Sequence, residues 1–333
     1  MLDSTSLATG GHENRRLPKG LRHWRNLSAL WAFPYDAVQH LRDESHRSSP
    51  ASHVFLRTLY RVSRGRSRQV IGAAMQRLRP IEADADPELI EMLRRTGLAQ
   101  IEGFVSEASV LALHDELSVL SGSIVGGPHH GERASYGDRP AATKLHFNPD
   151  DLMGIPEVAE LVASAELRSI AASYFRAVPI FTGLAAWWSF PDEDASDQQL
   201  DQAAQKFHFD YDWPLFLKFF VYLTPVDETN GPFTFVRGTH DQKARYTDGR
   251  RSDAEIEDTY GSSIRPCHGS AGDLIIADTS GFHKGARPES SPRLVLQLEY
   301  AISRLGASHQ YPPLPRELRP ANELGQTYAI FTK

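Results

Sequence analysis

The chain of 333 residues contains a single cysteine and no long apolar run. That cysteine, Cys267, has no second thiol to pair with, which excludes an intramolecular disulfide and any zinc site built on several thiolates. No stretch reaches the roughly 20 consecutive apolar residues that a membrane-spanning helix needs. The first 20 residues also lack the apolar core of a secretory signal. These absences predict a cytoplasmic protein.

Charge is distributed unevenly along the chain. The net charge is −6, but residues 1–80 carry an excess of Lys and Arg, so the remainder is strongly acidic. A basic arm over residues 15–79 either contacts a membrane surface or another anionic partner, or packs on its own acidic domain. Both interpretations stay open at this point. The acidic remainder would repel phosphate, so no nucleic-acid partner is expected, and nothing in the pattern indicates an oligomeric state.

Helical periodicity dominates the first half of the chain. In residues 54–78, apolar residues recur at helical spacing before and after Gly65, and Val70, Ala73 and Ala74 belong to the predicted apolar stripe. The pattern predicts a helix interrupted at Gly65 that packs through this stripe, with its arginines in solvent. Further expected elements are a helix over Glu88–Arg95, a strand over Ala99–Phe104, a helix from the N-cap Ser106 to Leu120, and a helix over Ala165–Phe175.

Short apolar segments separated by turn signals fill the second half. The expected strands are Ile180–Phe190, Lys206–Asp210, Leu217–Thr224, Pro232–Val236, Ser262–Pro266, Asp273–Asp278 and Arg293–Ile302. Asn230-Gly231 predicts a hairpin turn, because a type I′ turn needs positive φ at both central residues. The polar insert 192–205 is well placed for a lid. The pattern predicts a mainly β, α+β protein with a sandwich or jelly roll, whose helices cover one sheet.

Domain boundaries follow from shifts in composition. The predicted division is a basic, partly helical N-terminal extension over residues 1–85, a β-rich domain over 86–310, and a Pro-rich tail over 311–333. The first 20 residues are polar and Gly-rich, which is typical of a disordered segment.

The stretch KFHFDYDWP carries a histidine and two aspartates on alternating positions. In a strand, His208, Asp210 and Asp212 would project from one face. Such a pattern is either a hydrogen-bonded surface pair or part of a metal site. A site with two histidines and one carboxylate suits non-haem Fe(II) and needs a second histidine from elsewhere. Three histidines near strand ends are candidates: His240, His268 and His283.

The segment RLVLQLEYAI alternates between polar and apolar residues. Arg293, Val295, Gln297 and Glu299 share one face, and the apolar residues between them share the other. The apolar face belongs against a core, which turns Arg293 toward a polar interior. A buried arginine needs an anion, and a dicarboxylic co-substrate would supply one in a bidentate pair.

The motifs FHFDYDW, FLKFFVYLTPVDETNGPFTFVRGTH and GDLIIADTSGFHKGARPESSPR together resemble the phytanoyl-CoA dioxygenase-like (PhyH) branch of the Fe(II)/2-oxoglutarate oxygenases, over roughly residues 90–303. The resemblance implies a double-stranded β-helix. It implies that His208, Asp210 and His283 bind Fe(II), and that Arg293 binds the distal carboxylate of 2-oxoglutarate. With O2, family members oxidise a substrate C–H bond and release succinate and CO2. His240, in RGTH, is then structural.

Four further residues are candidates for the same pocket. Lys144 is expected to line the co-substrate site, and Phe220 to form its floor. Asp212 is expected to bind substrate or to hydrogen-bond to a metal ligand, and Trp188 to reach the pocket.

The function expected from the sequence is hydroxylation of a small or lipid-linked metabolite. An intact Asp210 favours hydroxylation over halogenation, since halogenating relatives lack this carboxylate. The acidic insert favours a neutral or cationic substrate. Two alternatives are a non-catalytic metal-binding jelly roll and a protein that docks on a membrane or a partner through its basic arm.

Overall fold

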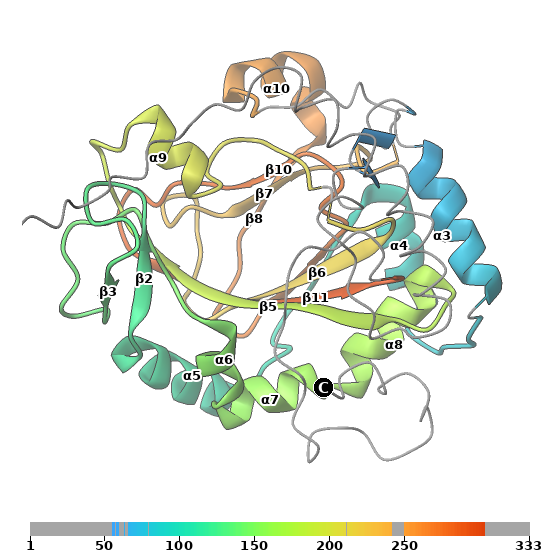
Figure 1. The fold of residues 1–333 in the computed structure, drawn as a ribbon, viewed down its shortest axis with the longest axis horizontal. Helices are drawn as coiled ribbons and strands as arrows, with labels where there is room; N and C mark the ends of the chain where they lie inside the picture. Colours follow the sequence, from blue (N-terminus) through green and yellow to red (C-terminus); the bar gives the residue numbers. More distant parts are fainter. Residues whose placement is uncertain are drawn as a thin grey trace, which may run out of the picture.

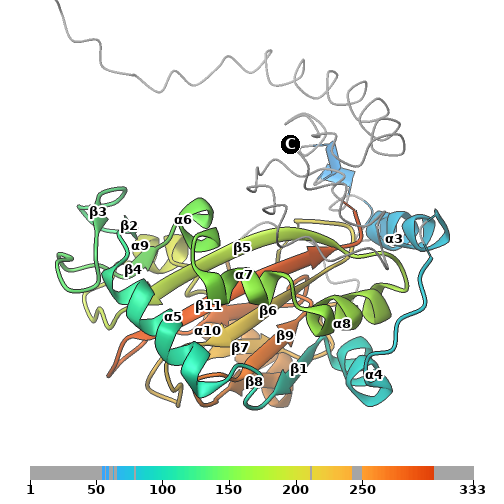
Figure 2. The same ribbon diagram turned by 90° about the horizontal axis from the view of Figure 1, so that it is seen from below.

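Two antiparallel β-sheets face each other, and helices cover the outer side of the larger sheet (Figure 1, Figure 2). The computed structural model describes residues 55, 56, 58, 59, 63, 66–78, 80–210, 212–241 and 250–303. From one side to the other, the layers are the helices α5 to α8, the large sheet, the small sheet and α10 (Figure 1). The predicted fold class, mainly β with flanking helices in a double-stranded β-helix, is confirmed.

The large sheet has eight strands in the order β1–β9–β6–β11–β5–β4–β2–β3, and the small sheet has the order β10–β7–β8. The strands are β1 Leu98–Ile101, β2 Gly122–Val125, β3 Arg133–Ala134, β4 Lys144–His146, β5 Ile180–Ser189, β6 Phe216–Tyr222, β7 Phe233–Val236, β8 Ile264–Cys267, β9 Leu274–Ala277, β10 His283–Gly285 and β11 Arg293–Ala301. Six of the seven expected strand segments correspond to these strands.

Helices account for much of the rest of the described chain. They are α3 Arg66–Leu78, α4 Pro87–Thr96, α5 Glu107–Val119, α6 Pro149–Met153, α7 Pro156–Val162, α8 Ala165–Phe175, α9 Asp197–Gln202, α10 Asp253–Tyr260 and the 3₁₀ turn η1 Gly261–Ser263. Ser106 and Ser164 cap α5 and α8 by accepting hydrogen bonds from backbone N–H groups of the first turn. Both caps support the predicted starts of these helices.

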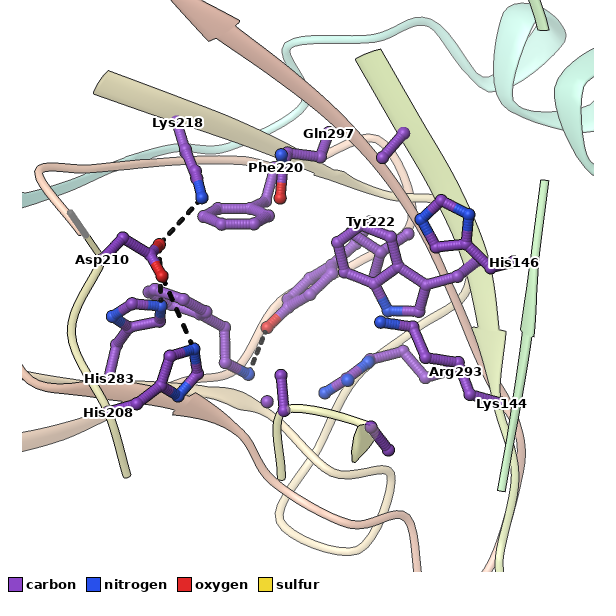
Figure 3. A pocket seen from close by; sticks show the side chains of 17 residues that line it. Lys144, His146, His208, Asp210, Lys218, Phe220, Tyr222, His283, Arg293 and Gln297 are labelled. Carbon is purple, nitrogen blue, oxygen red and sulfur yellow. Dashed lines mark hydrogen bonds and ion pairs between the residues drawn. The ribbon is translucent and has the colours of Figure 1, made fainter. Parts of the chain in front are cut away.

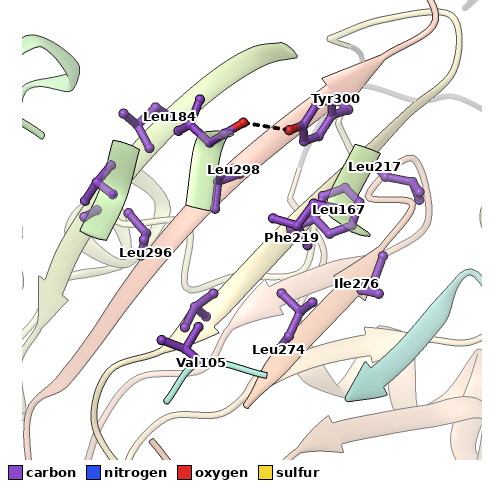
Figure 4. Packing of buried hydrophobic residues seen from close by; sticks show 14 of the residues in the cluster. Val105, Leu167, Leu184, Leu217, Phe219, Leu274, Ile276, Leu296, Leu298 and Tyr300 are labelled. Atoms are coloured by element: carbon purple, nitrogen blue, oxygen red, sulfur yellow. Dashed lines mark hydrogen bonds between the residues drawn. The ribbon is translucent and has the colours of Figure 1, made fainter. Parts of the chain in front are cut away.

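Strand β11 separates two interiors. It pairs with β5 on one side and with β6 on the other. The face of β11 that points toward the helices is apolar and buried, and it consists of Leu294, Leu296, Leu298 and Tyr300. These side chains belong to the main apolar core together with Leu167 of α8 (Figure 4). Leucines of α5 are part of the same core. Complete burial of each such side chain stabilises the fold by about 1.5–3 kcal/mol. The alternate residues of β11 face the space between the sheets, as the sequence predicts.

The Asn230-Gly231 hairpin prediction is wrong. The turn joins β6 of the large sheet to β7 of the small sheet, so its flanking strands do not pair. Gly231 has a φ of 72°, but Asn230 is not among the residues with positive φ. The Asp227 side chain instead accepts hydrogen bonds from the backbone N–H groups of Thr229 and Asn230. A chain crossing between sheets needs this local support, because no strand ladder continues across it.

Helix α3 is helical as predicted, but its buried face is not the predicted one. Val70, Ala73 and Ala74 are exposed, whereas Arg68 and Gly72 are buried. The Arg68 guanidinium lies over the Phe216 ring, 5.6 Å from its centroid, and its Nε donates to the Pro214 carbonyl at 3.2 Å. The long side chain of Arg68 supplies the packing contact. The prediction that the arginines of this helix lie in solvent is therefore wrong for Arg68.

Residues 1–54 and 304–333 lie outside the described part of the chain, as does Gly65. This includes most of the predicted basic arm, residues 15–79, and all of the predicted tail, residues 311–333. The predicted domain boundaries at residues 85 and 310 remain predictions. The predicted contact of the basic arm with a membrane or an anionic partner also remains a prediction. In the described part of the chain, no helix is long and apolar enough to cross a membrane.

Replacement of Gly231 by alanine is expected to destabilise the protein more than the same change at Gly103. Both residues have positive φ, which costs an alanine roughly 1–2 kcal/mol. A Cβ at Gly231 would also lie 2.4 Å from the Ala286 carbonyl oxygen, whereas a Cβ at Gly103 meets nothing within 4 Å. Overpacking adds about 1–3 kcal/mol at Gly231 only. Urea denaturation of both variants measures the difference, and equal losses would contradict it.

Candidate metal and co-substrate site

Two histidines are held side by side by their own backbones. The His208 N–H donates to the His283 carbonyl at 2.9 Å, and the His283 N–H donates to the His208 carbonyl at 2.7 Å. Residues paired in this way across antiparallel segments project their side chains to the same side. The imidazole centroids lie 4.3 Å apart. The space between the sheets therefore receives both rings together (Figure 3).

Hydrogen bonds to the backbone fix the tautomer of each ring. Nδ1 of His208 lies 2.9 Å from the Lys206 carbonyl, and Nδ1 of His283 lies 3.0 Å from the Gly281 carbonyl. A carbonyl only accepts, so each Nδ1 carries the proton and each Nε2 keeps a free lone pair. Burial lowers the pKa of His208 to about 3 and also lowers that of His283. Both rings are neutral near pH 7, which is the form that binds a metal.

Asp210 brings the carboxylate to the two rings. Its backbone N–H donates to the Thr279 carbonyl at 2.8 Å, which ties the loop to the segment before β10. Burial raises the pKa of this carboxyl, but Lys218 and then the two histidines lower it by more, so it lies well below its usual range. The carboxylate oxygens lie 3.8 Å from Nε2 of His208 and 3.5 Å from Nε2 of His283. One ligand atom from each residue lies within 4.8 Å of the others.

The cluster opens onto a cavity of about 270 Å³ between the sheets (Figure 3). The cavity is lined by Lys144, His146, Ala185, Trp187, Ala203, Ala204, His208, Asp210, Lys218, Phe220, Tyr222, Phe233, His283, Gly285, Arg293, Val295 and Gln297. The Tyr222 hydroxyl donates to the Cys267 carbonyl and accepts from the Phe233 N–H, so it connects the two sheets at the wall of the cavity.

Two cations at the end of the cavity away from the histidines have no anionic partner among the described residues. Arg293 is 3 % exposed, and its Nε and Nη1 have no hydrogen-bond partner there. Lys144 Nζ lies 4.2 Å from the centroid of the Trp187 ring. Arg293 on β11 and Lys144 on β4 are both register partners of Ser189 on β5, which lies between these two strands. Their side chains lie next to each other in Figure 3. Buried and unpaired charges are costly, so this end of the cavity fits an anion.

The repulsion between these cations appears in the pKa of Lys144. Burial is the largest cause, followed by Arg293, Lys218 and Arg250, and together they lower this pKa to about 7. His146 lies beside Lys144 on β4, and burial and Lys144 lower its pKa to about 4. His146 is therefore neutral at physiological pH.

The other predicted site residues divide into three cases. Phe220 lines the cavity and stacks near Phe233, with ring centroids 4.7 Å apart. Asp212 does not line the cavity, but its carboxylate accepts from Lys218 Nζ at 3.0 Å. The structure corrects the placement of Trp188, whose ring packs in the apolar core against Tyr136. Trp187, which precedes it on β5, faces the cavity instead, because neighbouring residues of a strand point to opposite faces.

Only one of the three candidate histidines joins His208. His240 lies away from the cavity, with Nε2 3.1 Å from the Arg94 carbonyl, and His268 is exposed at the end of β8. The expected strand Lys206–Asp210 is not regular. Phe207 and His208 each form one isolated β-bridge, to Arg251 and His283 respectively. The backbone N–H of Asp210 belongs to neither bridge and donates to the Thr279 carbonyl. Isolated pairings suffice to direct His208 inward without a continuous ladder.

Sequence reasoning gave no role to several residues at the cavity. Lys218, Trp187 and Gln297 face it, and Lys218 contacts the metal-ligand candidate Asp210 directly. The signal for Lys218 was a lysine on the same strand face as Phe220 in the apolar stretch FLKFF. Trp187 could be distinguished from Trp188 only with the β5 register.

The donor set fits a divalent transition metal and a dicarboxylate. Two neutral imidazoles and one carboxylate on one side of a cavity form the ligand set of non-haem Fe(II), with positions left open. The unpartnered Nε and Nη1 of Arg293, with Lys144 beside them, fit the distal carboxylate of 2-oxoglutarate. The residues present therefore suit both groups.

Comparisons with known proteins agree with this chemistry. The profile of the family described as phytanoyl-CoA dioxygenase (PhyH) matches residues 93–293. No curated protein matches the sequence.

Several solved structures are similar to this chain. The carbocyclase SnoK from nogalamycin biosynthesis is 18% identical, with a TM-score of 0.47, and the match covers 66% of this chain and 86% of that one. EvdO2 from Micromonospora carbonacea var. aurantiaca, complexed with 2-oxoglutarate, is 19% identical, with a TM-score of 0.47. The match covers 66% of this chain and 92% of EvdO2. HygX from Streptomyces hygroscopicus, with nickel and 2-oxoglutarate bound, is 15% identical with a TM-score of 0.43, and 72% and 96% are covered.

The family profile covers well over half of the chain and includes His208, Asp210, His283 and Arg293. The chain therefore belongs to the phytanoyl-CoA dioxygenase (PhyH) family, whose cofactors are Fe(II), 2-oxoglutarate and O2.

Proposed function

We propose that this protein is an Fe(II)/2-oxoglutarate-dependent dioxygenase that hydroxylates a C–H bond of a small or lipid-linked metabolite. The observation that supports this most is the pairing of two features in one cavity. His208, Asp210 and His283 lie together at one end, and Lys144 and Arg293, which have no anionic partner among the described residues, lie at the far end. A metal-chelating dicarboxylate would join the two ends.

Each group of residues has a distinct task in this proposal. His208, Asp210 and His283 hold Fe(II). Arg293 and Lys144 bind the distal carboxylate of 2-oxoglutarate, and the planar guanidinium sets its orientation through paired hydrogen bonds. When bound, iron and 2-oxoglutarate supply the oxidation: R–H, 2-oxoglutarate and O2 become R–OH, succinate and CO2.

The cavity walls protect this chemistry from water. Phe220, Phe233, Trp187 and Val295 place apolar surface around the space between the metal ligands and the cations. Exclusion of water strengthens the electrostatic interactions with the co-substrate and limits side reactions.

The insert 192–205 contributes to closure of the cavity. It carries α9, and the turn that follows brings Ala203 and Ala204 to the cavity wall. We propose that this insert is the lid that the sequence suggests.

The substrate would meet an uncharged part of the cavity. Once the co-substrate takes Arg293 and Lys144, the polar side chains left away from the iron site are Gln297, the neutral His146 and Tyr222, whose hydroxyl is already hydrogen-bonded to Cys267 and Phe233. At about 270 Å³ the cavity is near the lower end of the usual range of roughly 300–1,000 Å³ for ligand sites. We therefore propose that only a small neutral portion of the substrate enters it beside the co-substrate.

Addition of Fe(II) and 2-oxoglutarate to the protein without oxygen is expected to produce the visible charge-transfer band of the iron chelate. His208→Ala removes a metal ligand and abolishes the band. Arg293→Ala weakens 2-oxoglutarate binding by about 2–5 kcal/mol, the usual cost of losing one partner of a buried charge pair. Anaerobic titration followed by visible absorption measures both.

The matched control is His268→Ala, which removes an exposed histidine outside the cavity and leaves the band unchanged. Absence of the band in folded wild-type protein would sink the oxygenase assignment and favour the non-catalytic alternative. With the band present, substrate-dependent succinate release identifies the substrate.

The affinity for 2-oxoglutarate is expected to fall as the pH rises above about 7. Burial and the neighbouring Arg293, Lys218 and Arg250 lower the pKa of Lys144 in the free protein to about 7. A bound carboxylate favours the protonated form, so binding is strongest below this pH. Above it, binding must first protonate Lys144, and affinity drops up to about tenfold per pH unit. Anaerobic titrations between pH 6 and 9 at saturating metal measure this slope.

Two variants isolate Lys144 from other titrating groups. Lys144→Met is expected to bind 2-oxoglutarate more weakly at pH 6 and to lose the slope. Lys144→Arg keeps its charge across the range, so it binds well and also lacks the slope. If Lys144→Met kept the wild-type dependence of 2-oxoglutarate affinity on pH, another group would be the cause of that dependence, which would contradict the prediction.

A further inference from the structure

Lys218 contacts three carboxylates at the edge of the metal cluster. Its Nζ lies 2.8 Å from Oδ2 of Asp210 and 3.0 Å from Oδ2 of Asp212. It also lies 3.5 Å from Oε2 of Glu299. The lysine side chain is 12% exposed, so these interactions are little screened by solvent. Figure 3 shows the ammonium pointing at the Asp210 carboxylate from the side away from the histidines.

The strands fix the ammonium in this place. Lys218 on β6 is the register partner of Glu299 on β11. Glu299 is itself held, because Oε1 accepts hydrogen bonds from Thr182 Oγ1 at 2.8 Å and from Trp213 Nε1. Glu299 is 3% exposed and Trp213 is 2% exposed, which leaves neither side chain room to move away. The lysine therefore meets Asp210 from a rigid support.

The number of oxygens that Asp210 offers a metal decides how many positions stay open. A carboxylate binds through one oxygen or two. Two histidines and a one-oxygen carboxylate leave room for a chelating co-substrate and for O2. A second Asp210 oxygen on the metal would occupy a position that the co-substrate needs. In this structure both oxygens lie near the rings, Oδ1 3.8 Å from Nε2 of His208 and Oδ2 3.5 Å from Nε2 of His283, and of the two it is Oδ2 that accepts a hydrogen bond from Lys218, at 2.8 Å.

We propose that Lys218 is a positioning residue that holds Oδ2 of Asp210 and thereby restricts Asp210 to one metal-binding oxygen. Asp212 holds Lys218 in turn, at 3.0 Å, and the contact to Glu299 is longer, at 3.5 Å. This gives Asp212 a role through the ammonium rather than in contact with substrate. The inference rests on the proposed metal site, and it adds how that site keeps its positions open for 2-oxoglutarate.

A purely structural role would have other consequences. If Lys218 only neutralised buried carboxylates, its removal would lower stability, strengthen metal binding through the uncompensated negative charge, and leave the metal-bound geometry and the chelation of 2-oxoglutarate unchanged. The positioning role predicts a changed geometry: Asp210 gains a second metal contact, and chelation of 2-oxoglutarate suffers.

The experiment compares wild type, Lys218→Met, Lys218→Arg and Glu299→Gln, each checked for folding by circular dichroism. Mn(II) replaces iron, and water-proton relaxation counts the metal-bound waters without co-substrate. Crystal structures of the Mn(II) proteins show how many Asp210 oxygens bind. Anaerobic Fe(II) titrations give the dissociation constant of 2-oxoglutarate. Glu299→Gln is the matched control, because it removes a charge from the same network but keeps an oxygen that accepts from Thr182 and Trp213, and it leaves the two shorter contacts of Lys218, to Asp210 and Asp212, in place.

In wild type, one Asp210 oxygen is expected to bind the metal, and the other Asp210 oxygen is expected to accept a hydrogen bond from Lys218. Lys218→Met is expected to bind metal through both oxygens and to lose one metal-bound water. Its affinity for 2-oxoglutarate is expected to fall on the order of 10–100-fold, the scale on which groups that orient metal ligands affect metal affinity or activity. Lys218→Arg restores the wild-type water count. Glu299→Gln retains it.

Three results would overturn the positioning role. They are two-oxygen binding in wild type, one-oxygen binding in Lys218→Met with unchanged 2-oxoglutarate affinity, or the same losses in Glu299→Gln as in Lys218→Met. The crystal structure of the wild-type Mn(II) protein shows whether Asp210 binds through one oxygen or two, even if no variant folds. Failure of wild type to bind Mn(II) or Fe(II) at all would instead reject the proposed function, which separates the two failures.

Discussion

The site depends on one pair of backbone hydrogen bonds, those that join His208 to His283. Neither residue lies in the middle of a long strand, and 75 positions of sequence separate them. The reciprocal bonds set both rings on one side, and each ring then donates Nδ1–H to the carbonyl two residues before it. Because the backbone itself performs this alignment, the two Nε2 atoms of the proposed iron site are held in place without a metal.

Charge is divided between two ends of the same cavity. At one end a single ammonium, Lys218, offsets carboxylates that a divalent metal would further neutralise. At the other end Lys144 and Arg293 stand together without an anion in the described structure, at an electrostatic cost visible in the lowered pKa of Lys144. A protein retains such a repulsion where a ligand relieves it. The free protein is thus built for a bound dicarboxylate.

Much of the fold could be read from periodicity, and the errors have physical causes. The alternation in β11 gave the correct inward face, since every second residue of that strand packs on helices. The same reasoning failed for α3, where Arg68 packs over an aromatic ring and small apolar residues stay exposed. It also failed at Asn230-Gly231, because a local turn signal does not specify whether the flanking strands pair or belong to different sheets.

The sequence by itself determined the candidate ligand types, their motif spacing, the family and the inward face of β11, because these depend on residue identity and on the two-residue period of a strand. Only the tertiary structure decided which of three histidines joins His208, which of two neighbouring tryptophans faces the cavity, and that Lys218 holds Asp210. Those choices depend on strand register and on loops that cross between sheets. Contacts between residues far apart in the chain set both, and no local pattern encodes them.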